Sequence, residues 1–169
     1  MKRLTLAFII VFSATVAHAE TSIGDLIGGF IFTNSAVDVE GFRGLSGNKY
    51  VVAATYAKDI TTNAAVLLSY DRSFSRSNVA DPSHSDKLTG GLNLNTTLNI
   101  TTNFQVRIGG FEEAGVITSG PNSGSPVNIL GTYVDSNYKK LHYGFIYQNR
   151  TESDYFGGNY IGLRAGWSF

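Results

Sequence analysis

A group of basic side chains near the middle of the chain has the residue types that bind phosphate. Its members lie in or beside segment 73–86, which is otherwise rich in small polar residues: Arg72, Arg76, His84 and Lys87. A guanidinium forms paired, charge-assisted hydrogen bonds with phosphate oxygens, so the group is a candidate phosphate-binding site. Solvation of an ordinary polar loop explains the same residues, and the sequence alone leaves both interpretations open.

Residues suited to metal or cofactor chemistry are scarce. The chain has no Cys, which excludes a disulfide framework and a thiolate metal site. After the first 19 residues the only histidines are His84 and His142, which are far apart in the sequence. We therefore predict no metal site and no cofactor.

The start of the chain has the pattern of an export signal. Lys2 and Arg3 precede an apolar run over 4–16, and small residues follow up to Ala19. This pattern predicts a secretory signal peptide over residues 1–19 and one domain over residues 20–169. The apolar run is shorter than the roughly 20 residues that a membrane-spanning helix needs.

The composition of the predicted domain favours β structure. Without Lys2 and Arg3 it has 11 basic residues against 13 acidic ones, so its charge gives no support for a nucleic-acid partner. Gly and aromatic residues are frequent, whereas the strong helix formers Glu, Lys and Met are scarce.

Apolar and polar residues alternate with a period of two in eight segments, as in strands with two different faces. We predict these strands at 23–33, 49–57, 66–71, 87–99, 104–109, 127–133, 141–148 and 160–169. Short polar turns are expected at 58–63, 99–103 and 135–138, and long loops at 34–48, 73–86, 116–125 and 149–158. The alternation of short and long connections predicts an up-and-down meander with its long loops on one rim. The apolar residues of loop 34–48 are expected to pack over the barrel mouth.

The last segment, YIGLRAGWSF, separates its faces clearly, with Leu163, Trp167 and Phe169 on one side and Arg164 on the other. A soluble lipocalin-like barrel would point the apolar face inward, whereas a membrane barrel would point it toward lipid. The signal peptide and the terminal aromatic favour the membrane. In the sixth segment this assignment expects Val127, Ile129 and Tyr133 to face outward.

The same ten residues resemble the C-terminal assembly signal of bacterial outer-membrane barrels, carried here by Tyr160, Leu163, Trp167 and Phe169. The whole predicted domain resembles the small eight-stranded members of that class. The resemblance implies an all-β fold, an eight-stranded antiparallel up-and-down transmembrane β-barrel in the outer membrane. It also implies contact with outer-membrane lipid and with the barrel assembly machinery.

Charged residues on the opposite face are expected inside the barrel. They are Asp25, Lys49, Asp71, Lys87, Arg107, Glu113, Lys140 and Arg164. Buried charges require partners, so we expect Asp25 to pair with Arg107 or Arg164, and the acids Asp71 and Glu113 to pair with Lys49 and Lys87. An eight-stranded barrel has just enough interior for side chains, which predicts a plugged interior rather than a porin-like channel.

Two lipid A modifying enzymes are barrels of this size. The deacylase uses a Ser, a His and an acid on the outer face, but His142 is expected inside near the periplasmic end. Segments 104–119 and 125–134 are similar in outline to the fifth and sixth strands of the lipid A palmitoyltransferase. Its Asp-Ser pair could correspond to Asp71 and Ser73, although Arg72 separates them, and its first-strand His and N-terminal amphipathic helix are missing here.

The sequence thus predicts a monomeric, non-enzymatic barrel with no catalytic residues. Its role would be structural in the envelope or in surface interaction, through loops that contact lipopolysaccharide or an external partner. A lipid A modifying acyltransferase or deacylase is the alternative function.

Overall fold

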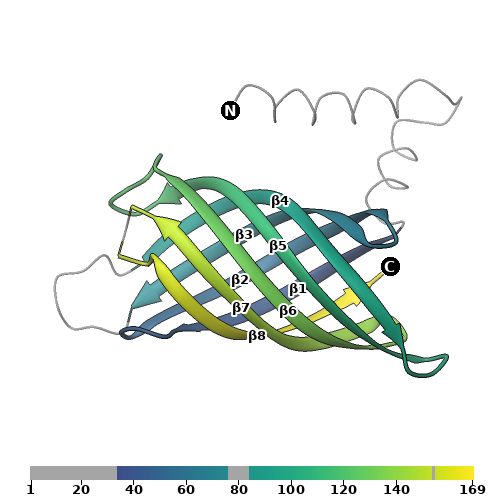
Figure 1. Cartoon of the computed structure of the whole chain (residues 1–169). Helices are drawn as coiled ribbons and strands as arrows, with labels where there is room; N and C mark the ends of the chain where they lie inside the picture. Colours follow the sequence, from purple (N-terminus) through teal and green to yellow (C-terminus); the bar gives the residue numbers. More distant parts are fainter. Residues whose placement is uncertain (1–33, 76–83, 154) are drawn as a thin grey trace, which may run out of the picture. The chain divides into compact units, whose positions relative to one another are not determined.

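Eight antiparallel strands close into a barrel in the computed structural model, which describes residues 34–75, 84–153 and 155–169 (Figure 1). The strands are β1 (Ser35–Gly44), β2 (Lys49–Thr61), β3 (Ala64–Ser75), β4 (His84–Asn99), β5 (Phe104–Ser119), β6 (Pro126–Tyr138), β7 (Leu141–Glu152) and β8 (Gly158–Ser168). Each strand pairs with its neighbours in sequence, and β1 pairs with β8 to close the barrel. The predicted eight-stranded up-and-down barrel is confirmed. Within these residues no helix has the length and apolarity needed to cross a membrane.

The first strand of the barrel is not the one that the sequence predicted. The predicted strand 23–33 lies outside the described residues, and β1 occupies most of the predicted loop 34–48. Val37 and Val39 face outward from it, while Asp38 and Glu40 are buried inside. The loop prediction was wrong because the inward Phe42 breaks the simple alternation of apolar and polar residues in this segment.

Both ends of the barrel are defined by the connections between strands. Residues 62–63, 100–103 and 139–140 join strands at the end where β1 begins and β8 finishes, which we call the turn end. The opposite end, which we call the loop end, carries residues 45–48 and 120–125; β3 and β7 also finish there, and β4 and β8 begin there. The loops there are shorter than predicted because the strands continue beyond the predicted limits. At the turn end the Phe169 N–H donates to the Ser35 carbonyl at 2.8 Å, so the last residue is fastened to the start of β1.

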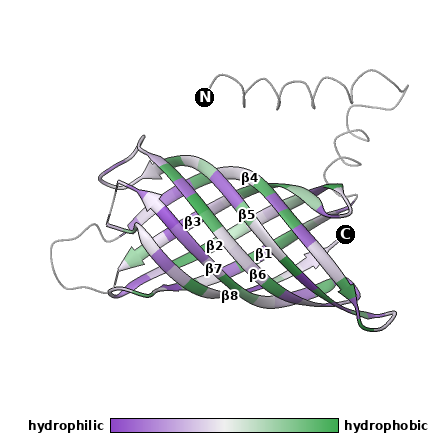
Figure 2. Ribbon diagram, viewed as in Figure 1, coloured by the Kyte–Doolittle hydropathy of each residue, from purple (hydrophilic) through white to green (hydrophobic). Residues whose placement is uncertain are grey.

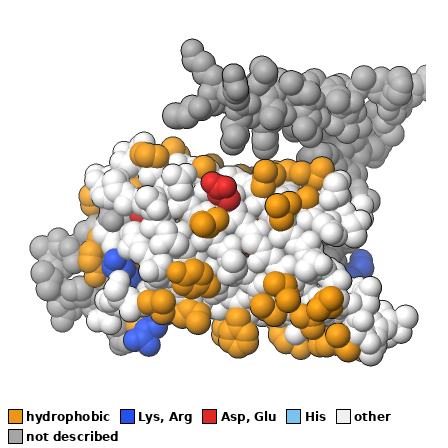
Figure 3. All heavy atoms as spheres, viewed as in Figure 1, with side chains coloured by type: hydrophobic (Ala, Val, Ile, Leu, Met, Phe, Trp, Pro, Cys, Tyr) orange, Lys and Arg blue, Asp and Glu red, His pale blue; other side chains and the backbone are white. Residues whose placement is uncertain are grey.

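The outward faces of the strands are largely apolar, whereas the inward faces combine charged, polar and apolar side chains. Figure 2 shows hydrophobic and hydrophilic residues interleaved along the ribbons, and Figure 3 shows an outer surface where hydrophobic side chains gather and charged ones are sparse. The outward side chains include Leu88, Leu92 and Leu94 on β4 and Phe145 on β7. We call this outward apolar surface the apolar belt; the interior holds the charged side chains together with a cluster of buried apolar residues such as Phe111 and Ile129.

The face assignment of the sixth segment is corrected by the structure. Val127, Ile129 and Tyr133 are buried inside the barrel, whereas Leu130 and Val134 face outward. Both faces of this segment contain branched apolar residues, so its apolar pattern did not identify the outward side. Asp135, two residues after Tyr133, is fully buried, which shows that this side of β6 faces the interior.

Candidate functional site

The half of the interior nearer the turn end contains a dense group of charged side chains. We call it the turn-half cluster; it consists of Asp38, Glu40, Arg107, Asp135, His142 and Arg164. Strands β1, β5, β6, β7 and β8 each contribute at least one of these residues at an inward position. The cluster therefore joins strands that are distant in the sequence across the barrel interior.

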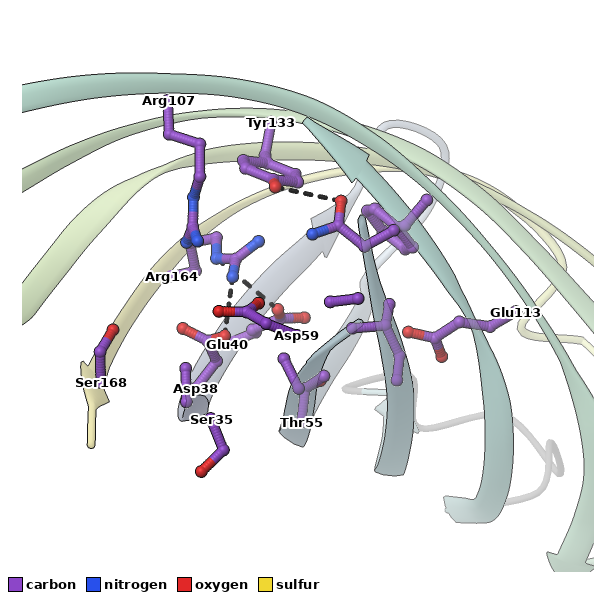
Figure 4. Close-up of a pocket in the computed structure, with 16 residues that line it drawn as sticks. Ser35, Asp38, Glu40, Thr55, Asp59, Arg107, Glu113, Tyr133, Arg164 and Ser168 are labelled. Atoms are coloured by element: carbon purple, nitrogen blue, oxygen red, sulfur yellow. Dashed lines mark hydrogen bonds and ion pairs between the residues drawn. The ribbon is translucent and has the colours of Figure 1, made fainter. Parts of the chain in front are cut away.

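Arg164 is at the centre of the turn-half cluster (Figure 4). Its Nη2 donates to Asp38 Oδ2 at 2.7 Å, and its Nε lies 3.6 Å from Asp135 Oδ2 and 4.0 Å from Glu40 Oε1. The guanidinium carbon lies 4.4 Å from the ring centre of Tyr133, a favourable position for a cation over an aromatic face. One cation thus faces three carboxylates and an aromatic ring.

The other members of the cluster add partners to the same acids. His142 Nε2 pairs with Asp38 Oδ1, and Arg107 Nη2 donates to Asp135 Oδ2 at 3.1 Å. Because Asp38 is fully buried, the compensating charge and hydrogen bonds must come from these side chains. The two partners of Asp38 lie on β7 and β8, so this acid fastens β1 to the strands that close the barrel.

A second charged group fills the interior nearer the loop end. This loop-half cluster consists of Asp71, Ser73, Lys87, Arg150 and Glu152. Lys87 Nζ lies 2.9 Å from Glu152 Oε2 and donates to Ser73 Oγ at 2.7 Å, and Arg150 pairs with Asp71. Lys87 and Glu152 have no exposed side-chain surface, so the pair is shielded from water.

Glu113 lies between the two clusters and is held in a different way. Its carboxylate accepts hydrogen bonds from Ser69 Oγ at 3.0 Å and from Thr89 Oγ1 at 2.5 Å. In the described part of the chain no cation lies within ion-pair distance of it. Hydroxyl groups therefore replace the lysines that the sequence analysis assigned to this acid.

The space left between the side chains is small. A cavity of about 40 Å³ lies beside the turn-half cluster, with Glu40, Asp59 and Glu113 among its lining residues (Figure 4). That volume holds only a few water molecules. Across the described residues, no group of three or more acidic or imidazole side chains is arranged to hold a metal ion.

The structure places most of the predicted interior charges inside the barrel but changes their partners. Asp71, Lys87, Arg107, Glu113 and Arg164 are inward, and the acid beside Arg164 is Asp38. The predicted acid, Asp25, lies outside the described residues. Asp71 pairs with Arg150 rather than with a lysine.

The other two predicted interior cations lie at the ends of the barrel. Lys140 is exposed in the turn between β6 and β7, so the prediction for this residue was wrong because the period-two pattern does not hold in a turn. Lys49 has the same inward direction as Val51 on β2 and is partly buried at the loop end, where its Nζ donates to the Gly157 carbonyl at 3.0 Å and lies 4.4 Å from the Tyr155 ring centre. Its partners are thus a carbonyl and an aromatic ring rather than the predicted acids.

Five interior charges were missed by the sequence analysis. They are Asp38, Glu40, Asp135, Arg150 and Glu152. Arg150 and Glu152 continue the inward face of β7 beyond the predicted segment, so extending the alternation by a few residues would have found them. Asp38 and Glu40 lie in the segment predicted as a loop, and Asp135 lies on the face of β6 that was predicted to point outward.

The predicted phosphate-binding residues do not stay together. Lys87 is inside the loop-half cluster and has no access to the outer surface, and Arg76 lies outside the described residues. Arg72 and His84 are exposed on β3 and β4 near the loop end. Arg72 Nε lies 3.4 Å from Asp86 Oδ1, yet 57% of the Arg72 side chain remains accessible.

The strand register adds Arg43, which was not among the predicted phosphate-binding residues, to this outer rim. Arg43, Tyr50, Phe74 and His84 are successive cross-strand partners on β1, β2, β3 and β4. The rings of Tyr50 and Phe74 are stacked with their centres 5.7 Å apart. We call Arg43, Arg72, His84 and these two rings the outer-rim row; it combines cationic and aromatic groups above the apolar belt.

The closing strand β8 follows its predicted faces, with Tyr160 on the inward side together with Arg164. Leu163, Trp167 and Phe169 are exposed on the outer surface, and Trp167 is half accessible. Tyr160, by contrast, is fully buried inside, where its hydroxyl donates to the Phe156 carbonyl at 2.5 Å. Tyr160 therefore supports the interior, and the other three residues form the outward apolar surface of the strand.

The residues considered for acyl chemistry are all in the interior. His142 is bound to Asp38, Ser73 accepts a hydrogen bond from Lys87, and Asp71 is paired with Arg150. A lipid acyl chain beside the barrel would meet the outward face, where none of these groups points. Their contacts assign them to packing of the interior.

Replacing Tyr133 with Phe tests the interior packing with a small change. Its hydroxyl donates to Asn93 Oδ1 at 3.0 Å, and both residues are buried. We expect Tyr133→Phe to lower the free energy of unfolding by about 1–2 kcal/mol because the Asn93 oxygen loses its donor. Urea titration of the folded barrel measures this, with Tyr143→Phe on the outward face of β7 as the matched control. Equal stability of the two variants would contradict a role for the buried hydrogen bond.

Comparison with solved structures identifies a protein domain with a similar fold. No protein-family model and no curated protein matches the chain. The crystal structure of the N-terminal β-barrel domain of Pseudomonas aeruginosa OprF is similar, with a TM-score of 0.58 and 12% sequence identity over 81% of this chain and 98% of that domain. At this identity the likeness concerns the fold alone, a closed antiparallel β-barrel.

Proposed function

We propose that this protein is a monomeric, non-enzymatic barrel of the bacterial outer membrane that binds lipopolysaccharide phosphates at its outer rim. The observation that carries the proposal is the outer-rim row, which lies directly above an outward apolar belt. Export through the signal peptide over residues 1–19 and assembly by the outer-membrane barrel machinery would bring it there.

The distribution of side chains on the outer surface supports a membrane location. Outer-membrane barrels have an apolar outer face, a polar interior and aromatic girdles at both interfaces. Tyr138, Trp167 and Phe169 are exposed near the turn end, and Tyr50 and Phe74 lie near the loop end. The turn end, which also holds Phe169, would face the periplasm, and the loop end would face outward.

The packed interior supports a structural role rather than conduction. Two clusters of ion pairs cross the barrel, and the cavity beside them holds only a few waters. We therefore expect no stable conductance when the protein is inserted into a planar lipid bilayer. Steady ion current at the level of an open channel would contradict this part of the proposal.

The outer-rim row has the chemistry to bind the phosphates of the outer leaflet. Arg43 is exposed, and no ion pair involves it within the described residues. Arg72 forms an ion pair with Asp86, but most of its side chain is still exposed. Guanidinium groups at the upper edge of an apolar belt meet lipid phosphates while the strands below them meet the acyl chains.

Lipopolysaccharide should stabilise the wild-type barrel through these residues. We expect lipopolysaccharide in the vesicles to raise the urea midpoint of unfolding, since a ligand that binds only the folded state stabilises it. Arg43→Gln combined with Arg72→Gln should weaken lipopolysaccharide binding by roughly tenfold or more, because a hydrogen bond to a charged group contributes about 1.5–3 kcal/mol. The matched control is Lys58→Gln combined with Lys139→Gln, which removes two charges near the turn end.

Dephosphorylated lipopolysaccharide identifies the group that is bound. It should stabilise the wild-type barrel and the Arg43/Arg72 variant equally. If intact lipopolysaccharide also stabilised the rim variant and the turn-end control to the same degree, the phosphate-binding role of the outer-rim row would be wrong.

A further inference from the structure

One acidic side chain lies on the wrong face of the barrel for a residue in lipid. Glu112 is near the midpoint of β5, between the buried residues Phe111 and Glu113, so its own side chain points outward. It is exposed, and no hydrogen bond or ion pair involves it within the described residues. A charged group in the middle of a membrane-facing surface is costly and is a mark of function.

The immediate neighbours of Glu112 provide no charge or hydrogen bond to compensate for it. Its cross-strand partners are Leu92 on β4 and Leu130 on β6, which are 58% and 62% exposed. Its outward neighbours on β5 are Gly110 and Ala114. The carboxylate is therefore set in an apolar surface.

Other outward charges stand much closer to the ends of the barrel. Arg43, Arg72 and Asp86 are near the loop end, and Lys58 is near the turn end. Side chains at such positions reach the polar interface of a bilayer. Glu112 is farther from both ends, so the apolar belt isolates it in a way that it does not isolate the others.

Small residues around Glu112 leave the backbone open to close approach. Gly110 and Ala114 flank it on β5, and Gly90 on β4 is the cross-strand partner of Ala114. Small residues permit tight contact between membrane-embedded segments, and polar side chains can hydrogen-bond across such contacts. Asn128 and Thr132 face outward on β6 at either side of Leu130 and could supply those bonds.

Charge decides which partner fits this surface. A second copy docked symmetrically on the same face would bring two Glu112 carboxylates together, and like charges in a low dielectric repel strongly. A partner with a cation at the same depth would instead neutralise the carboxylate. We propose that the face of β4, β5 and β6 centred on Glu112 docks a membrane-embedded segment of another protein that presents a Lys or Arg side chain to this carboxylate.

The inference rests on the membrane location proposed above, and the test separates the two. The mature barrel is folded into phosphatidylcholine vesicles with one of two labelled synthetic helices, each leucine-rich and membrane-spanning. One helix carries a single central Lys and the other carries Leu at that position. Energy transfer from Trp167, the only Trp in the chain, to the labelled helix measures their association.

We expect the Lys helix to bind wild-type barrel roughly tenfold more tightly than the Leu helix. Glu112→Gln and Glu112→Leu should abolish this preference while the barrel still floats with the vesicles. Glu112→Lys should reverse it in favour of a helix with a central Glu. Gly90→Leu combined with Ala114→Leu should weaken binding of the Lys helix, because the larger side chains block close approach although Glu112 remains.

Three results would overturn the docking proposal. Equal binding of the two helices to inserted wild-type barrel would do so without affecting the membrane location. Self-association of the barrel that depends on Glu112 would assign the face to a second copy. Failure of the folded barrel to float with vesicles would overturn the membrane location and the docking proposal together.

Discussion

Replacing Arg164 with Met should lower the free energy of unfolding of the barrel by about 3–5 kcal/mol, the range for removing one partner of a buried ion pair. Arg164 faces Asp38, Glu40 and Asp135 in the interior, and its donation to Asp38 is 2.7 Å long. Met retains much of the side-chain volume, so the loss would report charge rather than a cavity. Urea titration in vesicles, followed by the fluorescence of Trp167, measures the effect.

A matched control and a rescue identify the cause of that loss. Arg43→Met removes the same group from the outward face of β1, where Arg43 is exposed, and should change stability by less than about 0.5 kcal/mol in vesicles without lipopolysaccharide. Adding Asp38→Asn to Arg164→Met removes the carboxylate left without its guanidinium and should restore part of the stability. If Arg164→Met cost no more than Arg43→Met, the turn-half cluster would not stabilise the fold.

Replacing Gly91 with Ala should destabilise the barrel by about 3 kcal/mol, at the upper end of the range for an overpacked core. A Cβ at Gly91 would overlap the Glu112 carbonyl oxygen and lie 2.7 Å from Glu113 Cα. Both are backbone atoms of the paired strand β5, so they could move aside only by disturbing the β4–β5 pairing. The absence of a side chain here allows the two backbones to approach closely.

Gly41→Ala on β1 is the control for the Gly91 experiment. No atom lies within 4 Å of a Cβ at Gly41, which faces outward. This variant should leave stability unchanged or raise it by roughly 0.4–1 kcal/mol, because Ala restricts the unfolded chain. The same urea titration compares both variants, and a similar loss in each would show that backbone approach at Gly91 is not the cause.

The direction of each side chain, inward or outward, was the feature that could be predicted best. On β4, β7 and β8 a period of two correctly separated outward residues such as Leu92, Phe145 and Leu163 from inward ones such as His142 and Arg164. Successive side chains of a strand point to opposite faces. A segment with one polar and one apolar face therefore shows in its own sequence which residues point inward. The antiparallel order and seven of the eight strands followed from the same pattern and from the short turns, whereas β1 lies in a segment that was predicted as a loop.

Side-chain direction could not be predicted from the alternation where both faces of a segment contain apolar residues. On β6, Ile129 inside and Leu130 outside are equally apolar, and only Tyr133 and Asp135 show by their partners which side is the interior. On β1 the inward Phe42 obscured the alternation of Asp38 and Glu40 with the valines. A local pattern cannot resolve such segments, because the neighbouring strands decide which face is buried.

The local pattern was enough to predict an up-and-down barrel, seven of its eight strands, the shared faces on most of them, and charged side chains in the interior. It could not predict which charges meet. Asp38 reaches Arg164 and His142, Arg150 reaches Asp71, and Glu113 is held by hydroxyl groups. Alternation acts along one strand, whereas these contacts depend on register and on closure of β1 against β8, which relate strands distant in sequence. The register of β5 against β4 and β6 likewise places Glu112 between Leu92 and Leu130 in the apolar belt.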